Sequence, residues 1–232
     1  MAIDVEQEKQ LAAEAAATLV ESGMRVGLGT GTTVAHFLPA LARRKLDLRC
    51  VTTSPRTGEL ATRLGLSVEP FTLDRLDIAI DGADQISPEG WLVKGGGAAL
   101  TREKLVAITA ERFVVIADSR KPVPVLHAPV PLELLAFGLE STIRRLGPVR
   151  RRDAPLSPDG GVIADFTGDV GDPARLAARL EATPGVVEHG LFPPEMVATI
   201  LVGRGESVER IDLVRTGSPA SATTPTSGSD PG

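Results

Sequence analysis

Two short, mainly apolar runs constrain the fold of this chain more than any other feature of the sequence. Residues 76–80 and 113–117 each have the length of a single strand, and apolar side chains dominate both. Such a run predicts a strand that is buried on both faces of a sheet. Because helical patterns alternate with strand-like runs up to residue 128, we expect a doubly wound, mostly parallel sheet of the Rossmann-like α/β class.

The elements of this first region can be placed from local signals. An Ala-rich pattern with apolar residues at helical spacing predicts the first helix, and Gly23 is expected to stop it. Ser54 is a candidate helix cap and Gly65 a candidate stop. We therefore expect helices over 4–21, 34–43 and 54–64 and from 98 onward, with strands at 25–28, 48–51, 67–69, 76–80 and 113–117.

Composition changes at residues 122–131, where four prolines in ten residues predict a domain boundary. The pattern that follows, strand 130–135, helix 137–146, strand 148–153, strand 162–166, helix 173–182 and strand 186–191, has the β-α-β-β-α-β order of a ferredoxin-like α+β domain. Two later strands, 196–202 and 208–213, are expected to return to the first sheet. We thus predict a catalytic domain of residues 1–128 completed by 196–215, a smaller domain of 129–195, and a disordered tail of 216–232.

Charge and composition exclude several functional classes. The 232-residue chain has a formal net charge of −5, whereas nucleic-acid-binding domains normally carry a basic face, so no nucleic-acid partner is expected. No apolar run approaches the roughly 20 residues of a membrane span. The N-terminus also lacks a signal-peptide pattern, so we expect a cytoplasmic protein with no membrane partner.

The metal-ligating residue types are few and scattered. Cys50 is the only cysteine, and its apolar neighbours predict a buried strand residue rather than a nucleophile. His36, His127 and His189 stand singly, without the pairing of a zinc or transition-metal site. We therefore expect no metal site.

A glycine-rich loop lies between the first predicted strand and the second helix. Its sequence from residue 27 to 33 is Gly-Leu-Gly-Thr-Gly-Thr-Thr, an arrangement that can cradle phosphate on backbone N–H groups. It lacks the glycine that a dinucleotide fingerprint would place at Thr32 and the Gly-Lys-Ser/Thr ending of a Walker loop. A small phosphate ester is therefore the better ligand, and a tight turn with hydroxyl caps is the structural alternative.

The segment from residue 81 to 104 holds most of the remaining chemistry. Asp81 follows a buried strand, at the sheet edge where α/β proteins bind ligands, and Asp84 comes next. Lys94 precedes three glycines and the start of a helix that carries Glu103. Carboxylates this close titrate as a coupled set suited to proton transfer, and a lysine can stabilise an oxyanion. Alternatively, the aspartates cap turns and the glycines form only a flexible connection.

Five motifs together resemble the ribose-5-phosphate isomerase type A family across nearly the whole chain apart from the tail. They are the glycine loop at 27–33, Asp-Gly-Ala-Asp at 81–84, Lys-Gly-Gly-Gly-Ala-Ala-Leu-Thr-Arg-Glu-Lys at 94–104, Ala-Asp-Ser-Arg-Lys at 117–121 and Pro-Gly-Val-Val at 184–187. They occur in the order of the family and at similar separations.

The resemblance implies interconversion of D-ribose 5-phosphate and D-ribulose 5-phosphate in the pentose phosphate pathway, through an enediol and without cofactor. It also implies a homodimer or homotetramer. The implied catalytic residues are Glu103 as proton-shuttling base with Asp81, Asp84 and Lys94. The implied substrate-binding residues are Thr30, Gly31, Thr32, Thr33, Asp81, Gly82, Ala83, Asp84, Lys94, Gly95, Gly96, Gly97 and Lys121, with Lys9 a weaker candidate for the phosphate.

The chain departs from the family at two positions. Gln85 stands where the family usually has Glu, and Ser157-Pro158-Asp159-Gly160-Gly161 replaces a Thr-Asp-Asn-Gly-Asn turn. Two other functions stay open. A non-catalytic sugar-phosphate sensor would need a DNA-binding segment and a degraded catalytic acid, and a different sugar-phosphate isomerase or deaminase would combine the same phosphate loop with different acids.

Overall fold

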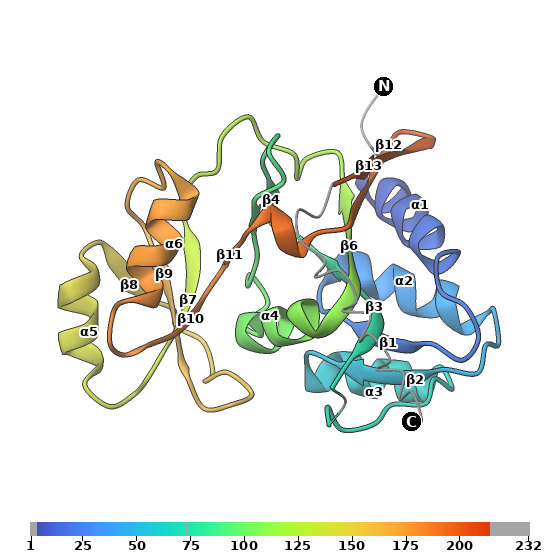
Figure 1. The fold of residues 1–232 in the computed structure, drawn as a ribbon, viewed down its shortest axis with the longest axis horizontal. Helices are drawn as coiled ribbons and strands as arrows, with labels where there is room; N and C mark the ends of the chain where they lie inside the picture. The colour runs from blue at the N-terminus through green and yellow to red at the C-terminus, as the bar shows by residue number, and fades with distance from the viewer. Residues whose placement is uncertain (1–3, 73, 214–232) are drawn as a thin grey trace, which may run out of the picture.

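The computed structural model describes residues 4–72 and 74–213, and within them the main sheet lies on one side of the molecule (Figure 1). Its spatial order is β13-β12-β6-β3-β1-β2, and every neighbouring pair is parallel except β12 with β13. The strands are β1 (Arg25–Leu28), β2 (Arg49–Thr52), β3 (Leu76–Gly82), β6 (Ala110–Asp118), β12 (Thr199–Arg204) and β13 (Ser207–Asp212).

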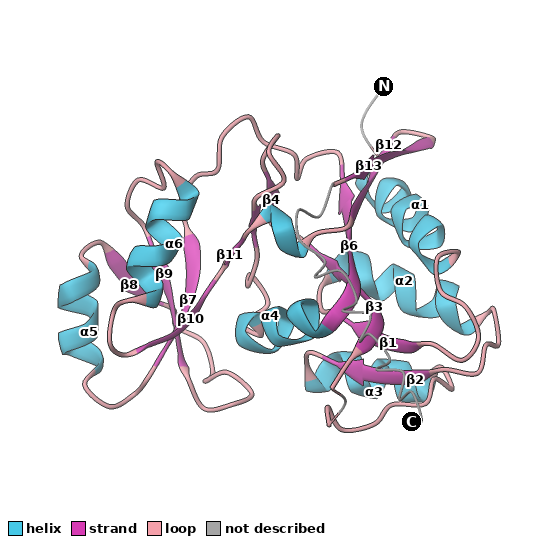
Figure 2. Cartoon of the chain, in the orientation of Figure 1, coloured by secondary structure: helices cyan, strands magenta, loops and turns pink. Residues whose placement is uncertain are grey.

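Helices cover both faces of this sheet, as the doubly wound prediction requires (Figure 2). On one face, α1 (Val5–Ala17) and α2 (Thr32–Ala42) pack their apolar stripes on the strands. On the other face lies α4 (Leu100–Thr109), which packs Val106 against β1 and β3. A side chain at Gly27 would meet Val106 at 2.4 Å, so glycine in β1 allows this close approach. The other helix that belongs to the main sheet, α3 (Pro55–Arg63), begins after its N-cap residue Ser54.

The second sheet forms a smaller layer with helices against it. Its order is β10-β7-β9-β8, all antiparallel, which is the arrangement of a ferredoxin-like β-α-β-β-α-β unit. The elements are β7 (Val130–Leu134), α5 (Leu139–Leu146), β8 (Val149–Arg151), β9 (Val162–Phe166), α6 (Pro173–Glu181) and β10 (Val186–His189). The predicted fold class, a mostly parallel sheet with a smaller α+β domain, is confirmed.

A third, small sheet joins the two layers and was not foreseen. It consists of β4 (Gln85–Ile86), β5 (Leu92–Val93) and β11 (Leu191–Phe192), and neither β4 nor β5 was among the predicted strands. The predicted strand 186–191 divides at Gly190, because the chain leaves β10 there to pair with β5. Gly190 accepts a hydrogen bond from the Lys94 N–H at 2.8 Å, and a side chain at that glycine would meet the Lys94 carbonyl at 2.2 Å.

Other boundaries also differ from the prediction. The first helix ends at Ala17 rather than residue 21, residues 67–69 form only a bridge between Cys50 and Val68, and η1 (Pro194–Met196) precedes β12. Cys50 is fully buried in β2, as expected. The division into domains stays a prediction, and the tail at 216–232 lies outside the described residues. In the described part of the chain no helix has the length and apolar character of a membrane span.

The buried side chain of Glu8 connects α1 to the backbone that directly follows β6 and β12 of the main sheet. One carboxylate oxygen accepts from the Ser119 N–H at 3.0 Å, and the other accepts from the Gly205 N–H at 2.8 Å. Burial acts to raise the pKa of Glu8, but the interactions with Ser119 and Gly205 outweigh it and hold that pKa below its usual range. Backbone of α1 also touches β12, where a side chain at Gly203 would lie 2.0 Å from the Glu8 carbonyl oxygen.

We expect Glu8→Gln to lower the free energy of unfolding by about 1–3 kcal/mol, because an amide N–H group would face one of two backbone donors in a buried site. Chemical denaturation at pH 7 measures this. Glu14→Gln, on an exposed part of the same helix, is the matched control, and equal stabilities of the two variants would contradict the assignment.

Candidate active site

Asp81 contacts both the glycine-rich loop and the charged residues of the site. It lies near the end of β3 and is only 3% exposed. Its Oδ1 atom accepts hydrogen bonds from the Thr30 N–H at 3.0 Å and the Gly82 N–H at 2.7 Å. Its Oδ2 atom lies 3.0 Å from the Lys94 ammonium. A single carboxylate therefore connects the glycine-rich loop to the charged cluster.

Gly29 leaves the space that the Asp81 carboxylate occupies. A side chain at this position would lie 2.1 Å from the Asp81 carboxylate, so no other residue fits between β1 and β3 here. The first two glycines of the loop thus serve packing, Gly27 against α4 and Gly29 against Asp81. The third glycine has a different role at the start of α2.

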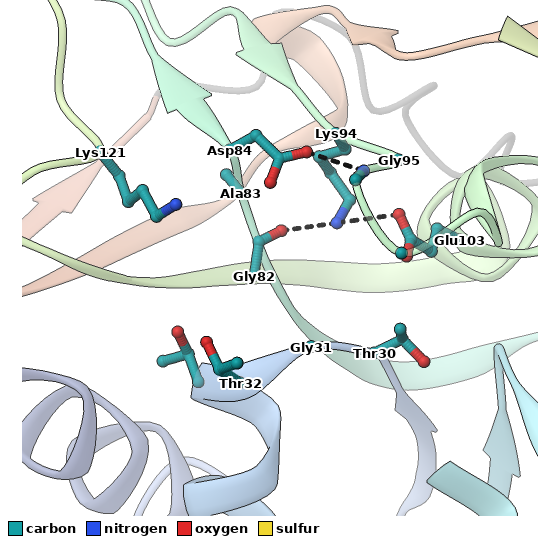
Figure 3. Close-up of a pocket in the computed structure, with 13 residues that line it drawn as sticks. Thr30, Gly31, Thr32, Gly82, Ala83, Asp84, Lys94, Gly95, Glu103 and Lys121 are labelled. Atoms are coloured by element: carbon teal, nitrogen blue, oxygen red, sulfur yellow. Dashed lines mark hydrogen bonds and ion pairs between the residues drawn. The ribbon is translucent and has the colours of Figure 1, made fainter. Parts of the chain in front are cut away.

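Lys94 and Glu103 form a buried ion pair beside Asp81 (Figure 3). Lys94 follows β5, and its Nζ atom donates to the Gly82 carbonyl at 2.5 Å and lies 3.2 Å from Glu103 Oε2. Glu103 comes from the first turn of α4, as the sequence predicts. The side chains of Lys94 and Glu103 are each 3% exposed, so water screens their interaction little.

Burial raises the pKa of Glu103 to about 7, with the Lys94 ammonium opposing this shift and the Asp81 carboxylate adding to it. Burial alone would lower the pKa of Lys94, but the carboxylates of Asp81 and Glu103 outweigh it and raise that pKa above its ordinary value. Near neutral pH, the cluster therefore combines a permanent cation with a carboxyl group that can both accept and return a proton.

The glycines after Lys94 form one wall of the site. Gly95 has a φ of 101°, in the region that favours glycine, and packs against Leu100 and Pro131. The Gly96 N–H donates to Asp84 Oδ2 at 2.9 Å, so Asp84 anchors this loop. The loop thus brings several backbone amide groups to the cavity with no side chain in the way.

The loop before α2 forms the opposite wall. Gly31 is the N-terminal cap of α2, with a φ of 119°, and the space around its Cα is open. The helix N-terminus at Thr32 and Thr33 therefore presents free N–H groups and a favourable dipole to an anion. The Thr30 hydroxyl is turned instead toward α3, 2.5 Å from Ser54 Oγ and 2.8 Å from Thr57 Oγ1, and the Thr30 N–H donates to Asp81.

Almost all of the predicted site residues line a single pocket. Figure 3 shows Lys121 and Glu103 on opposite sides of it. The lining residues are Thr30, Gly31, Thr32, Thr33, Gly82, Ala83, Asp84, Lys94, Gly95, Gly96, Gly97, Glu103 and Lys121. Asp81 lies behind this lining, in contact with Lys94, and the predicted direct contact of Asp81 with substrate stays a prediction. Lys9 pairs with Glu6 at 2.7 Å and is not among the lining residues.

Sequence reasoning missed the residues that support this pocket from the smaller layer. Thr101 donates to Glu133 at 2.5 Å, and Arg102 pairs with Asp159 at 2.7 Å, so two neighbours of Glu103 are fixed from outside the main sheet. Arg152 donates to the carbonyls of Gly95 and Gly96. Thr101 and Arg102 lie in the 94–104 motif and Asp159 in the altered turn, but no sequence signal revealed these contacts, because each joins segments more than thirty positions apart.

The two departures from the family pattern have clear local structures. The Gln85 amide donates to the His127 carbonyl at 2.8 Å and accepts from the His127 N–H at 2.9 Å. An ionised glutamate could accept the second hydrogen bond but could not donate the first. Ser157 accepts from the Gly161 N–H at 2.9 Å and donates to Glu133, so it closes the altered turn. Across residues 4–72 and 74–213, no group of three or more His, Cys, Asp and Glu side chains has the arrangement of a metal site.

The chain belongs to the ribose 5-phosphate isomerase A family, whose model, also described as phosphoriboisomerase A, matches residues 49–207. Ribose-5-phosphate isomerase A of Caulobacter sp. (strain K31) is 43% identical over 225 residues, covering 90% of this chain and 99% of that relative. Residues 4–68 also match a model described as the DeoR C terminal sensor domain.

Solved structures agree with this assignment. Ribose 5-phosphate isomerase A from Methanocaldococcus jannaschii superposes with a TM-score of 0.83 at 32% identity, covering 88% of this chain and 97% of the other. A D-ribose-5-phosphate isomerase in complex with phospho-erythronic acid gives a TM-score of 0.85 at 33% identity, covering 90% and 100%.

The raised pKa of Glu103 predicts a pH dependence of stability. The native carboxyl group holds its proton up to about pH 7, whereas the unfolded group releases it near 4.5, so the native state binds more protons between these values. His189, whose pKa burial lowers to about 4, contributes a slope of the opposite sign to both proteins. We therefore expect the free energy of unfolding of the wild type to fall with rising pH relative to that of Glu103→Gln across this window. Denaturant titrations of both proteins from pH 4.5 to 7.5 test this, and parallel curves would contradict it.

Proposed function

We propose that this protein interconverts D-ribose 5-phosphate and D-ribulose 5-phosphate through an enediol, with Glu103 as the base that moves the proton. The observation that carries the proposal is the buried pair of Lys94 and Glu103, at 3.2 Å, on the wall of a pocket whose opposite wall is a helix N-terminus. One side suits proton transfer beside a developing negative charge, and the other suits a phosphate group.

The isomerisation requires one group to take a proton from C2 of the aldose and to return it to C1. Glu103 suits this role because its pKa of about 7 makes it a stronger base than an exposed glutamate while leaving much of it ionised at neutral pH. As the C2–H bond breaks, its electrons form the C1–C2 double bond and charge passes to the C1 oxygen. The Lys94 ammonium and the amide groups of the glycine wall then stabilise the enediolate. When Glu103 returns the proton to C1, the proton of the C2 hydroxyl passes to the C1 oxygen and C2 becomes the carbonyl carbon.

The phosphate group would bind at the N-terminus of α2. The first N–H groups of the helix at Thr32 and Thr33, the backbone of Gly31 and the Lys121 ammonium border that end of the pocket. Asp81 would act through Lys94 rather than on the sugar, since its two oxygens are already used by Thr30, Gly82 and Lys94. Asp84 would contact a sugar hydroxyl while it holds Gly96.

The alternative of a non-catalytic sugar-phosphate sensor is not favoured. Its support is the match of residues 4–68 to a sensor-domain model, a segment that contains the loop before α2. Lys94 and Glu103 lie outside that segment, and a sensor has no need of a buried carboxyl group with a raised pKa. The homodimer or homotetramer and the cytoplasmic location implied by the family resemblance stay proposals, of which analytical ultracentrifugation tests the first.

We expect Gly31→Val to raise the KM for ribose 5-phosphate at least about 10-fold, because a β-branched residue cannot adopt this φ without moving the N–H groups of the helix terminus. Steady-state kinetics and inhibition by inorganic phosphate measure the change. Gly23→Val is the matched control, since Gly23 also has a positive φ in open space but lies far from the pocket. An unchanged KM and phosphate inhibition would rule out this phosphate site.

We expect Glu103→Gln to lower kcat by roughly 10² to 10⁴, with substrate binding changed only a few fold, because the amide keeps the shape and cannot accept the proton. Turnover is assayed in the presence of a chelator, which also tests the prediction that no metal is needed. In deuterated water the wild type should incorporate solvent deuterium at the carbon that receives the proton, and the variant should not. Near wild-type turnover by the variant would place the base elsewhere.

A further inference from the structure

Arg152 reaches the glycine wall of the pocket from the smaller sheet. It directly follows β8, and its side chain is 20% exposed. The guanidinium Nε and Nη2 atoms donate to the Asp165 carboxylate at 2.9 and 2.6 Å. The remaining Nη1 atom donates to the Gly95 carbonyl at 3.1 Å and the Gly96 carbonyl at 3.2 Å. The planar guanidinium therefore contacts a carboxylate on one edge and two peptide carbonyls on the other.

These two carbonyls belong to peptide units of the glycines that line the pocket. In a trans peptide the C=O and N–H bonds point in opposite directions, so a carbonyl held by Arg152 aims its N–H group away from Arg152. The Gly95 carbonyl is paired in this way with the Gly96 N–H, which donates to Asp84 Oδ2 at 2.9 Å. The Gly96 carbonyl is paired with the N–H of Gly97, a residue that lines the pocket.

Other anchors of this wall fix the Gly95 carbonyl, which also accepts from the Ala98 N–H at 3.1 Å, but not the Gly96 carbonyl. Asp84 holds the Gly96 N–H, and the Lys94 N–H donates to Gly190, which precedes β11. Neither contact sets the peptide unit between Gly96 and Gly97. Glycine offers no side chain to restrict that unit, so without an external partner it can rotate with little steric cost.

We propose that Arg152 is a positioning residue for the isomerisation, which holds and polarises the glycine peptides so that the Gly97 N–H donates to the enediolate. A cation on a peptide carbonyl draws electron density from the amide and makes its N–H a stronger donor. A fixed donor is worth most when charge develops on the substrate, so the benefit falls on the transition state. Asp165 keeps the guanidinium in place and offsets its charge. The inference rests on the proposed isomerase function.

Arg152→Gln should lower kcat/KM for ribose 5-phosphate about 10- to 100-fold, with the larger part in kcat. The matched control is Arg151→Gln, which removes the same charge from the neighbouring exposed residue of β8. Arg152→Lys should resemble Arg152→Gln, because a single ammonium cannot span Asp165 and both carbonyls. Rescue by lysine, or activity of Arg152→Gln within about twofold of the control, would overturn the proposal.

Binding measurements separate positioning from a general structural loss and do not depend on turnover. The probes are phospho-erythronic acid, whose carboxylate carries charge as an enediolate does, and inorganic phosphate. Arg152→Gln should weaken binding of the acid about 10-fold or more and leave inorganic phosphate within about threefold, because the phosphate loop is untouched. Equal weakening of both ligands would overturn the proposal.

A further variant covers the case in which Arg152→Gln does not fold. Asp165→Asn keeps the guanidinium but loosens it, so kcat should fall by about 3- to 10-fold while inorganic phosphate binding is kept. Wild-type kcat in Asp165→Asn and Arg152→Lys together would overturn the inference. Turnover by the wild type and Arg151→Gln tests the isomerase function itself, so failure of that function and failure of the Arg152 role are distinguishable.

Discussion

The site depends on one carboxylate that is shared by three partners. Asp81 Oδ1 accepts two backbone hydrogen bonds, and Oδ2 pairs with Lys94 at 3.0 Å. Because Gly29 leaves room for it, this carboxylate holds the phosphate loop and the lysine at a fixed separation. Lys94 in turn holds Glu103 at 3.2 Å, so the base and the helix N-terminus on either side of the pocket are tied to the same residue at the end of β3.

The charged cluster also explains why the fold needs its smaller sheet. Lys94 follows the short strand β5 and Glu103 lies on α4, and both elements lie between the two main layers (Figure 1). A buried carboxyl group with a raised pKa costs stability, so the segments that carry it need support from elsewhere. That support comes from Glu133 and Asp159, which bind the residues just before Glu103, and from Arg152, which binds the glycine wall. The smaller sheet therefore positions the site as well as flanking it.

Much of the site could be predicted from the sequence because the residues that carry chemistry follow strands or begin helices. Asp81 ends a buried strand, Gly31 begins α2 and Glu103 lies in the first turn of α4, each a place that local pattern marks. The third sheet could not be predicted, because strands as short as β4 and β5 have no measurable periodicity. The role of Arg152 could not be predicted either, since its partners lie in β9 and the glycine wall.

By itself, the sequence determined the alternation of strands and helices, the phosphate-binding loop and the set of acids and lysine, because these follow from hydrophobic period, glycine geometry and side-chain chemistry within short windows. Only the tertiary structure decided that Asp81 lies behind the pocket, that the Thr30 hydroxyl faces α3, and that Glu103 has a pKa of about 7. Burial and charge separation are properties of segments distant in the chain, and no local pattern contains them.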